Sequence, residues 1–161
     1  MKKHIIGIIG LGYVGLPLLI EFSKKYKTVG YDKNNNRINT LKNCNDYNNE
    51  LSNSERKSLK YLYLSSNIND LNDCNILIVT VPTPITKKNI PDLSLLKSYC
   101  ELIGKILNKK DIVIYESTVY PGCTEEDCVP VLEKYSKLKY NKDFFCGYSP
   151  ERINPGDKNR T

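Results

Sequence analysis

The stretch IIGIIGLGYVGLPLLIEF, residues 5–22, decides how the rest of the sequence is interpreted. An apolar run leads directly into three glycines, Gly10, Gly12 and Gly15, and a helical pattern follows them. The motif G-x-G-x-x-G between a strand and a helix has a physical role for each glycine. The first allows a tight turn, the second lets a diphosphate approach the backbone, and the third lets helix and strand pack closely. The start of the helix directs its amide groups at the diphosphate. A plain packing turn without a ligand is the alternative.

A carboxylate further along the chain favours the dinucleotide interpretation. Asp32 ends the next predicted strand, 22 residues after Gly10. At this place an acidic residue accepts hydrogen bonds from the adenine ribose, and its charge repels the 2′-phosphate of NADP. Lys33 and Arg37 are nearby cations that could accommodate that phosphate, but the balance favours NAD. A simple turn residue before three asparagines is the alternative for Asp32.

Short apolar runs rich in Ile, Val and Tyr alternate with helical patterns along the chain. They predict strands over residues 4–9, 28–31, 61–64, 76–81, 112–115 and 144–148. The helical patterns predict helices over residues 14–26, 35–42, 54–60, 92–107 and 123–138. This alternation predicts an α/β fold, a doubly wound parallel sheet of Rossmann type with strand order 3-2-1-4-5-6. We expect one dinucleotide-binding domain over residues 1–161.

Individual residues refine these boundaries. Asp92 follows a proline-rich loop and is expected to cap the next helix. Pro130 lies inside the last helical pattern and is expected to kink that helix or delay its start. The polar stretch over residues 43–53 has the weakest pattern and is expected to form a mobile loop.

Composition and charge exclude several classes of protein. The chain is 40% apolar and 26% charged, and no apolar run is long enough to span a bilayer, so we expect no membrane segment. The net charge of +6 comes from lysines scattered among asparagines, which argues against nucleic-acid binding. The basic start leads into the glycines without a cleavage site, which predicts a cytoplasmic protein.

The six cysteines could indicate disulfide bonds or a metal site, and neither is favoured. No pair has the spacing C-x-x-C, and His4 is the sole histidine, so we expect reduced thiols and no metal. Cys123 and Cys128 come nearest to a pair. Five residues apart on a helix, they are expected to point away from each other.

Polar stretches follow three of the predicted strands: TVPTP at 80–84, ESTVYPGCT at 116–124 and SPERINPGD at 149–157. The carboxyl ends of parallel strands meet at one edge of the sheet, so these stretches converge with the glycine loop. There Glu151 is available for proton transfer, and Arg152 for an anionic or hydroxyl-rich substrate. Ordinary solvated residues are the alternative for both.

Five motifs carry a family resemblance: GLGYVGLPL, YDKNNNR, VPTP, ESTVYPGCTEE and YSPERINPGD. In this order and spacing, over nearly the whole chain, they resemble the NAD-binding part of the UDP-glucose/GDP-mannose dehydrogenase family. The sequence is most similar to the branch that oxidises UDP-N-acetylglucosamine or UDP-N-acetylgalactosamine at C6 for surface polysaccharides. Members acting on UDP-glucose usually carry a second glutamate four residues after the first, where this chain has Pro155.

The resemblance implies a role for each matching residue. The backbone of the glycine loop is implied to hold the diphosphate; its residues are Gly10, Leu11, Gly12, Tyr13, Val14 and Gly15. Asp32 is implied to bind the ribose, and Arg37 the adenosine side. Thr83 and Thr118 are implied to contact the nicotinamide side, with Thr118 also close to the reacting centre.

The resemblance also implies catalytic and substrate residues. Glu151 matches a glutamate with an acid/base role. The substrate-contacting stretch is implied to be Arg152, Ile153 and Asn154. Family members oxidise the C6 alcohol to a carboxylate in two steps, with two NAD and a thioester on a cysteine. Cys123 and Cys146 lie near the predicted site but outside the family's nucleophile motif, and both are interpreted as small apolar residues.

These implications predict the cofactor-binding half of a nucleotide-sugar dehydrogenase, inactive by itself. The family's dimer helix and its UDP-binding domain lie outside this sequence, and a homo-oligomer is expected for the full-length enzyme. A non-catalytic module that senses NAD, or pairs with a separate second half, is the alternative. A dehydrogenase of hydroxy acids is a third interpretation, which SPERINPGD argues against.

Overall fold

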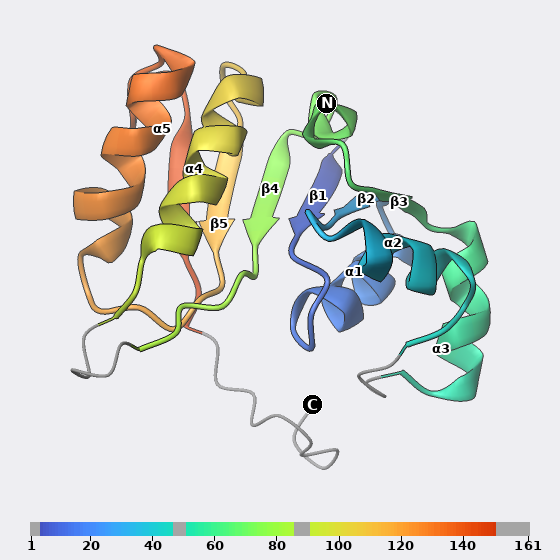
Figure 1. Ribbon diagram of the computed structural model, residues 1–161. Helices are drawn as coiled ribbons and strands as arrows, with labels where there is room; N and C mark the ends of the chain where they lie inside the picture. Colours follow the sequence, from blue (N-terminus) through green and yellow to red (C-terminus); the bar gives the residue numbers. More distant parts are fainter. Residues whose placement is uncertain (1–3, 47–50, 86–90, 151–161) are drawn as a thin grey trace.

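The computed structural model describes residues 4–46, 51–85 and 91–150 (Figure 1). Its centre is a six-stranded sheet in the order β3-β2-β1-β4-β5-β6. The strands are β1 (Ile5–Ile9), β2 (Lys27–Tyr31), β3 (Tyr63–Ser65), β4 (Ile76–Val79), β5 (Ile112–Tyr115) and β6 (Phe145–Tyr148). All neighbouring strands pair in parallel. The predicted Rossmann-type fold and its strand order are confirmed.

Helices cover both faces of the sheet (Figure 1). They are α1 (Gly15–Ser23), α2 (Asn35–Lys42), α3 (Asn53–Ser58), α4 (Ser94–Ile106) and α5 (Val129–Ser136). Short turns η1 (Leu59–Tyr61), η2 (Ile68–Leu71) and η3 (Thr124–Cys128) complete the fold. None of the helices in the described ranges is long and apolar enough to cross a membrane.

The central strands are apolar along their length because both of their faces are buried. On β1, Ile6 and Ile8 join a core with α1 and α2, whereas Ile9 joins a second core with α4 and α5. The chain leaves β1 toward one face and β4 toward the other, so a crevice opens between their carboxyl ends. The glycine loop lies at this crevice.

The last predicted helix begins with a π turn, which overturns one expectation. In η3 the hydrogen bonds join residues five apart, and Val129 donates its N–H to the carbonyl of Thr124. This wider turn brings the thiols of Cys123 and Cys128 into hydrogen-bond contact, so the prediction that they point apart was wrong. Pro130 falls in the first turn of α5, where a helix tolerates a missing N–H.

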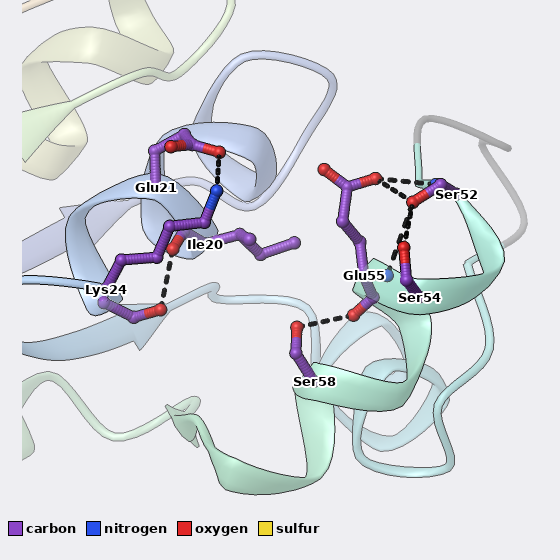
Figure 2. Close-up of polar contacts among 8 residues, drawn as sticks. Ile20, Glu21, Lys24, Ser52, Ser54, Glu55 and Ser58 are labelled. Atoms are coloured by element: carbon purple, nitrogen blue, oxygen red, sulfur yellow. Dashed lines mark hydrogen bonds and ion pairs between the residues drawn. The ribbon is translucent and has the colours of Figure 1, made fainter.

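Polar side chains support the starts of α3 and α4. Ser52 and Glu55 form a capping box at α3: the Ser52 N–H donates to Glu55 Oε2 over 2.8 Å, and the Glu55 N–H donates to Ser52 Oγ over 3.4 Å (Figure 2). Asp92 Oδ1 accepts a hydrogen bond from the Ser94 N–H over 2.9 Å, although the N-cap residue of α4 is Leu93. Asp92 therefore supports the helix start from the position before the N-cap, and the helix begins one residue later than expected.

The polar stretch over residues 43–53 is anchored in the parts that the structure describes. Asp46 is 1% exposed and is bonded to Arg37 of α2, and Leu51 is buried in the core beside α1 and α2. Residues 47–50 of this expected loop lie outside the described residues.

Candidate functional site

The three glycines of the loop meet three different steric conditions. Gly10 has φ +92°, in the left-handed region that favours glycine. A Cβ on Gly15 would lie 1.8 Å from the carbonyl oxygen of Gly10 and 2.4 Å from Thr80 Oγ1, so only glycine fits. A Cβ on Gly12 would meet nothing within 4 Å. The loop therefore makes the tight turn, packs α1 closely against the sheet, and leaves open space for a diphosphate.

Asp32 is held at the mouth of the crevice by two backbone donors. The Leu11 N–H donates to Asp32 Oδ2 over 2.9 Å, and the Asn34 N–H donates to Asp32 Oδ1 over 2.8 Å. Each carboxylate oxygen can accept a further hydrogen bond. Asp32 is thus oriented and half-buried, and its oxygens can still receive ribose hydroxyls.

Arg37 supports the glycine loop from inside the protein. Its side chain is 4% exposed; Nε donates to the carbonyl of Leu11 over 2.9 Å, and its guanidinium forms a 2.9 Å ion pair with Asp46. The predicted contact of Arg37 with the adenosine side stays a prediction. The Leu11 side chain is fully buried in the core, so Leu11 takes part through its backbone.

Hydroxyl groups join the loops that follow the strands. Thr80 Oγ1 donates to the carbonyl of Gly10 over 2.7 Å, which ties the end of β4 to the glycine loop. Ser117 Oγ donates to the carbonyl of Val81 over 2.8 Å, and Thr83 Oγ1 donates to the carbonyl of Thr118 over 2.7 Å. The loops after β4 and β5 therefore form one surface.

Thr83 and Thr118 thus lie side by side, and the side chain of Thr118 is exposed. Their contact with the nicotinamide side stays a prediction. Sequence reasoning missed Thr80 and Ser117 as individual residues. The signal was present, since each is a hydroxyl residue shortly after an apolar strand.

These elements enclose a cavity of about 410 Å³. Its walls are the glycine loop with Tyr13 and Val14, Asp32, the two joined loops, and Leu95 and Tyr99 of α4. A larger hollow of about 790 Å³ lies at the opposite edge of the sheet and includes Tyr26, Tyr61 and Tyr63. We assign the functional site to the smaller cavity because it holds the glycine loop and the oriented carboxylate at the crevice where such sheets bind ligands.

A charged network fixes the loop after β5 against α4. The Tyr120 hydroxyl donates to Asp127 Oδ2, and Lys97 Nζ forms a 2.7 Å ion pair with Asp127 Oδ1. These contacts lower the pKa of Asp127, chiefly through Lys97, and the hydrogen bond to Asp127 raises the pKa of Tyr120 to about 12. The tyrosine therefore stays neutral at physiological pH.

The described cysteines are all free thiols. Cys123 is buried, and burial raises its pKa to about 12; burial raises the pKa of Cys146 likewise to about 12. Such thiols are poor nucleophiles, which agrees with their interpretation as apolar residues. No group of three His, Cys, Asp or Glu side chains within the described ranges could hold a metal ion.

The predicted catalytic Glu151 and the substrate stretch Arg152, Ile153 and Asn154 lie outside the described residues. The last described residues, Ser149 and Pro150, follow β6 at the carboxyl edge of the sheet. The Ser149 N–H donates to the carbonyl of Tyr115 over 2.9 Å.

A parallel sheet with a glycine loop at its crevice and a carboxylate after β2 defines the class as a dinucleotide-binding Rossmann domain. The chain belongs to the UDP-glucose/GDP-mannose dehydrogenase family, because the sequence profile of that family's NAD binding domain matches residues 4–160. NAD is the cofactor of this domain. The open space over Gly12 and the free acceptor positions on Asp32 fit that cofactor.

Relatives and solved structures agree with this family. The chain is 58% identical over 158 residues to UDP-N-acetyl-D-glucosamine 6-dehydrogenase of Pseudomonas aeruginosa, covering 98% of this chain and 37% of that protein. It is 55% identical over 153 residues to the enzyme of the same name from Salmonella typhi, covering 95% and 36%. The chain therefore spans little more than a third of the length of these relatives.

Two solved structures resemble the fold. UDP-D-ManNAc dehydrogenase from Pyrococcus horikoshii matches with a TM-score of 0.81 at 31% identity, over 94% of this chain and 37% of that one. NDP-N-acetyl-D-galactosaminuronic acid dehydrogenase from Methanosarcina mazei matches with a TM-score of 0.85 at 25% identity, over 96% and 36%.

Proposed function

We propose that this chain is the NAD-binding part of a dehydrogenase that oxidises the C6 alcohol of a UDP-N-acetylhexosamine to the uronate, for surface polysaccharide synthesis. The observation that carries the proposal is the glycine loop with Asp32 bonded across it, in a chain 58% identical to a UDP-N-acetyl-D-glucosamine 6-dehydrogenase. Pro155, at the position where UDP-glucose enzymes usually carry a second glutamate, supports an N-acetylhexosamine as substrate.

In this proposal the residues divide the work along the cofactor. The backbone of residues 10–15 and the positive end of α1 hold the diphosphate. Asp32 accepts hydrogen bonds from the adenine ribose, and its charge excludes a 2′-phosphate. Arg37 keeps the loop in shape from beneath. Thr83 and Thr118 form the nicotinamide side, where they are already joined.

The chemistry takes place at the carboxyl edge beyond β6. NAD supplies the hydride acceptor when it is bound. Glu151 exchanges the proton of the C6 hydroxyl as acid and base, Thr118 lies beside the reacting centre, and residues 152–154 contact the sugar nucleotide. These assignments rest on the match to the family's motifs and on the position of Ser149 at this edge.

The wider setting belongs to the proposal too. Residues 1–161 form one NAD-binding domain, and the dimer helix, the UDP-binding domain and the nucleophilic cysteine belong to the remaining part of a longer enzyme that forms homo-oligomers. The share of relatives that this chain covers, 37%, supports this division. Six free thiols support a reducing compartment, the cytoplasm.

Calorimetric titration with NAD and NADP tests the cofactor site. We expect NAD to bind more tightly than NADP, and Asp32→Ala to weaken NAD at least about 10-fold because charge-assisted hydrogen bonds to the ribose are lost. Asp73→Ala, which removes an exposed carboxylate at the opposite edge, is the control and should bind NAD like the parent. Unchanged NAD affinity in Asp32→Ala would contradict the proposed site.

Complementation tests the reaction itself. Mixing the chain and NAD with the separately made carboxyl-terminal part of a relative should yield NADH when UDP-N-acetylglucosamine or UDP-N-acetylgalactosamine is added. A complex that forms and binds NAD without turnover of either sugar nucleotide would favour the alternative, a non-catalytic module that senses NAD.

A further inference from the structure

Tyr99 is a cavity residue that the family's motifs do not include. It lies on α4 one helical turn after Leu95, and both side chains line the 410 Å³ cavity. Although α4 follows β4, the Tyr99 side chain reaches across the crevice toward the end of β2. It is 6% exposed, so its polar group needs a partner inside the protein.

The ring and the hydroxyl of Tyr99 hold the residues on either side of Asp32. The ring packs edge-on against Tyr31, with centroids 6.4 Å apart and planes at 79°. The hydroxyl faces the backbone of Lys33, whose N–H acts to lower the pKa of the phenol. Tyr31 precedes Asp32 and Lys33 follows it. The Tyr99 side chain, from the opposite half of the sheet, therefore packs against the turn that carries this carboxylate.

The surroundings of Tyr99 keep its phenol uncharged. Burial is the main cause that raises the pKa of Tyr99 to about 12, and the nearby charge of Asp32 adds to it. At pH 7 the phenol is therefore uncharged and does not repel the carboxylate. The Asp32 oxygens also accept hydrogen bonds from the N–H groups of Leu11 and Asn34. The glycine loop and the turn after β2 therefore orient the carboxylate directly, and Tyr99 of α4 supports the same turn.

We propose that Tyr99 is a positioning residue for cofactor selection: it fixes the turn at Asp32 so that the carboxylate faces the adenine ribose and excludes a 2′-phosphate. This inference rests on the proposed function, because it requires Asp32 to bind the ribose. Without the hydroxyl the turn can relax, and the carboxylate can swing aside for the phosphate of NADP.

Tyr99→Phe keeps the ring and removes only the hydroxyl. We expect NAD affinity to fall about 5-fold, because the polar contact of the hydroxyl with the turn at Lys33 is lost. NADP affinity should be unchanged or improved, so that the preference for NAD over NADP narrows at least about 5-fold. Tyr115→Phe is the matched control. Its buried hydroxyl also contacts α4, 3.2 Å from Cys100 Sγ, but Tyr115 does not line the cavity.

Amide hydrogen exchange of the ligand-free chain gives a second readout. The Lys33 amide should exchange about 10-fold faster or more in Tyr99→Phe than in the parent, and at the parental rate in Tyr115→Phe. Equal weakening of NAD and NADP, or an unchanged Lys33 exchange rate, would overturn the inference and leave Tyr99 a packing residue. A parent chain that binds no NAD, or an Asp32→Ala variant that binds it normally, would instead contradict the proposed function.

Discussion

The two edges of the sheet carry two hollows of opposite character. The hollow at the amino edge is the larger, about 790 Å³, and contains exposed tyrosine rings, with Tyr61 78% and Tyr63 57% exposed. The cavity at the carboxyl edge is about half that size, but a fixed glycine loop, an oriented carboxylate and hydroxyl-bonded loops surround it. Polar groups held in place, and not volume, therefore identify the site.

Gly15→Ala should destabilise the carboxyl edge of the sheet more than any other substitution considered. The new Cβ would collide with the backbone oxygen of Gly10, so α1 or β1 must shift, which should cost about 4 kcal/mol or more of the free energy of unfolding. Urea denaturation measures it. Gly147→Ala is the control, since its Cβ would lie 3.8 Å from the Ile114 side chain, an ordinary contact. Equal stability of the two variants would show that close packing does not define this edge.

Arg37→Met should have the next largest effect. It removes one partner of a buried ion pair and leaves the Asp46 carboxylate buried without its guanidinium, which should destabilise the fold by about 3 kcal/mol. The double variant Arg37→Met/Asp46→Leu should recover much of this loss, because it buries no charge. A double variant as unstable as the single one would mean that Arg37 acts through the Leu11 carbonyl alone.

Gly12→Ala should separate binding from folding. The added methyl group meets nothing in the ligand-free protein, so the melting temperature should match that of the parent. The methyl group occupies the space over the loop where a diphosphate approaches, and we expect NAD affinity to fall about 10-fold in calorimetric titration. Parental affinity would place the diphosphate elsewhere in the cavity.

The smallest expected effect is a pH dependence at Asp127. The pKa of Asp127 is lowered in the folded state, chiefly by Lys97. Its contribution to the free energy of unfolding is therefore fully present above the unfolded pKa of about 4, and it is lost as the pH falls through the folded pKa. Lys97 is 45% exposed, which limits the contribution to about 0.5 kcal/mol. Urea denaturation between pH 7 and pH 3 should show a loss of stability that is larger in the parent than in Asp127→Asn by about 0.5 kcal/mol, since other carboxylates with lowered pKa values contribute equally to both. Equal losses in the two proteins would show that Asp127 contributes nothing to the pH dependence.

Local pattern was enough to predict the sheet and to place the glycine loop and Asp32 of the candidate site together. Apolar runs bounded by glycine and proline placed the strands, and the interval from Gly10 to Asp32 identified a carboxylate that the structure bonds to the glycine loop. The run over residues 61–64 was placed too early, because Tyr61 ends a 3₁₀ turn and β3 begins at Tyr63. Alternating Tyr and Leu fit both states.

Other features depend on contacts that no local pattern encodes. The ion pair of Arg37 with Asp46 joins a helix to a stretch that was interpreted as a loop. The contact of Cys123 with Cys128 depends on a π turn, which leaves no periodic signal over five residues. The reach of Tyr99 to Lys33 requires α4 to be docked across the crevice. Each arises from tertiary packing.

The bond from Thr80 to the carbonyl of Gly10 spans 70 residues of sequence. During synthesis, β1, α1 and β2 can assemble as a local unit, but the glycine loop acquires its final shape only after β4 has been made and has paired with β1. The site is therefore incomplete until that pairing has formed, and NAD can stabilise a chain only from then on. The rate at which newly made chains gain affinity for NAD should thus report the closing of β4 onto β1.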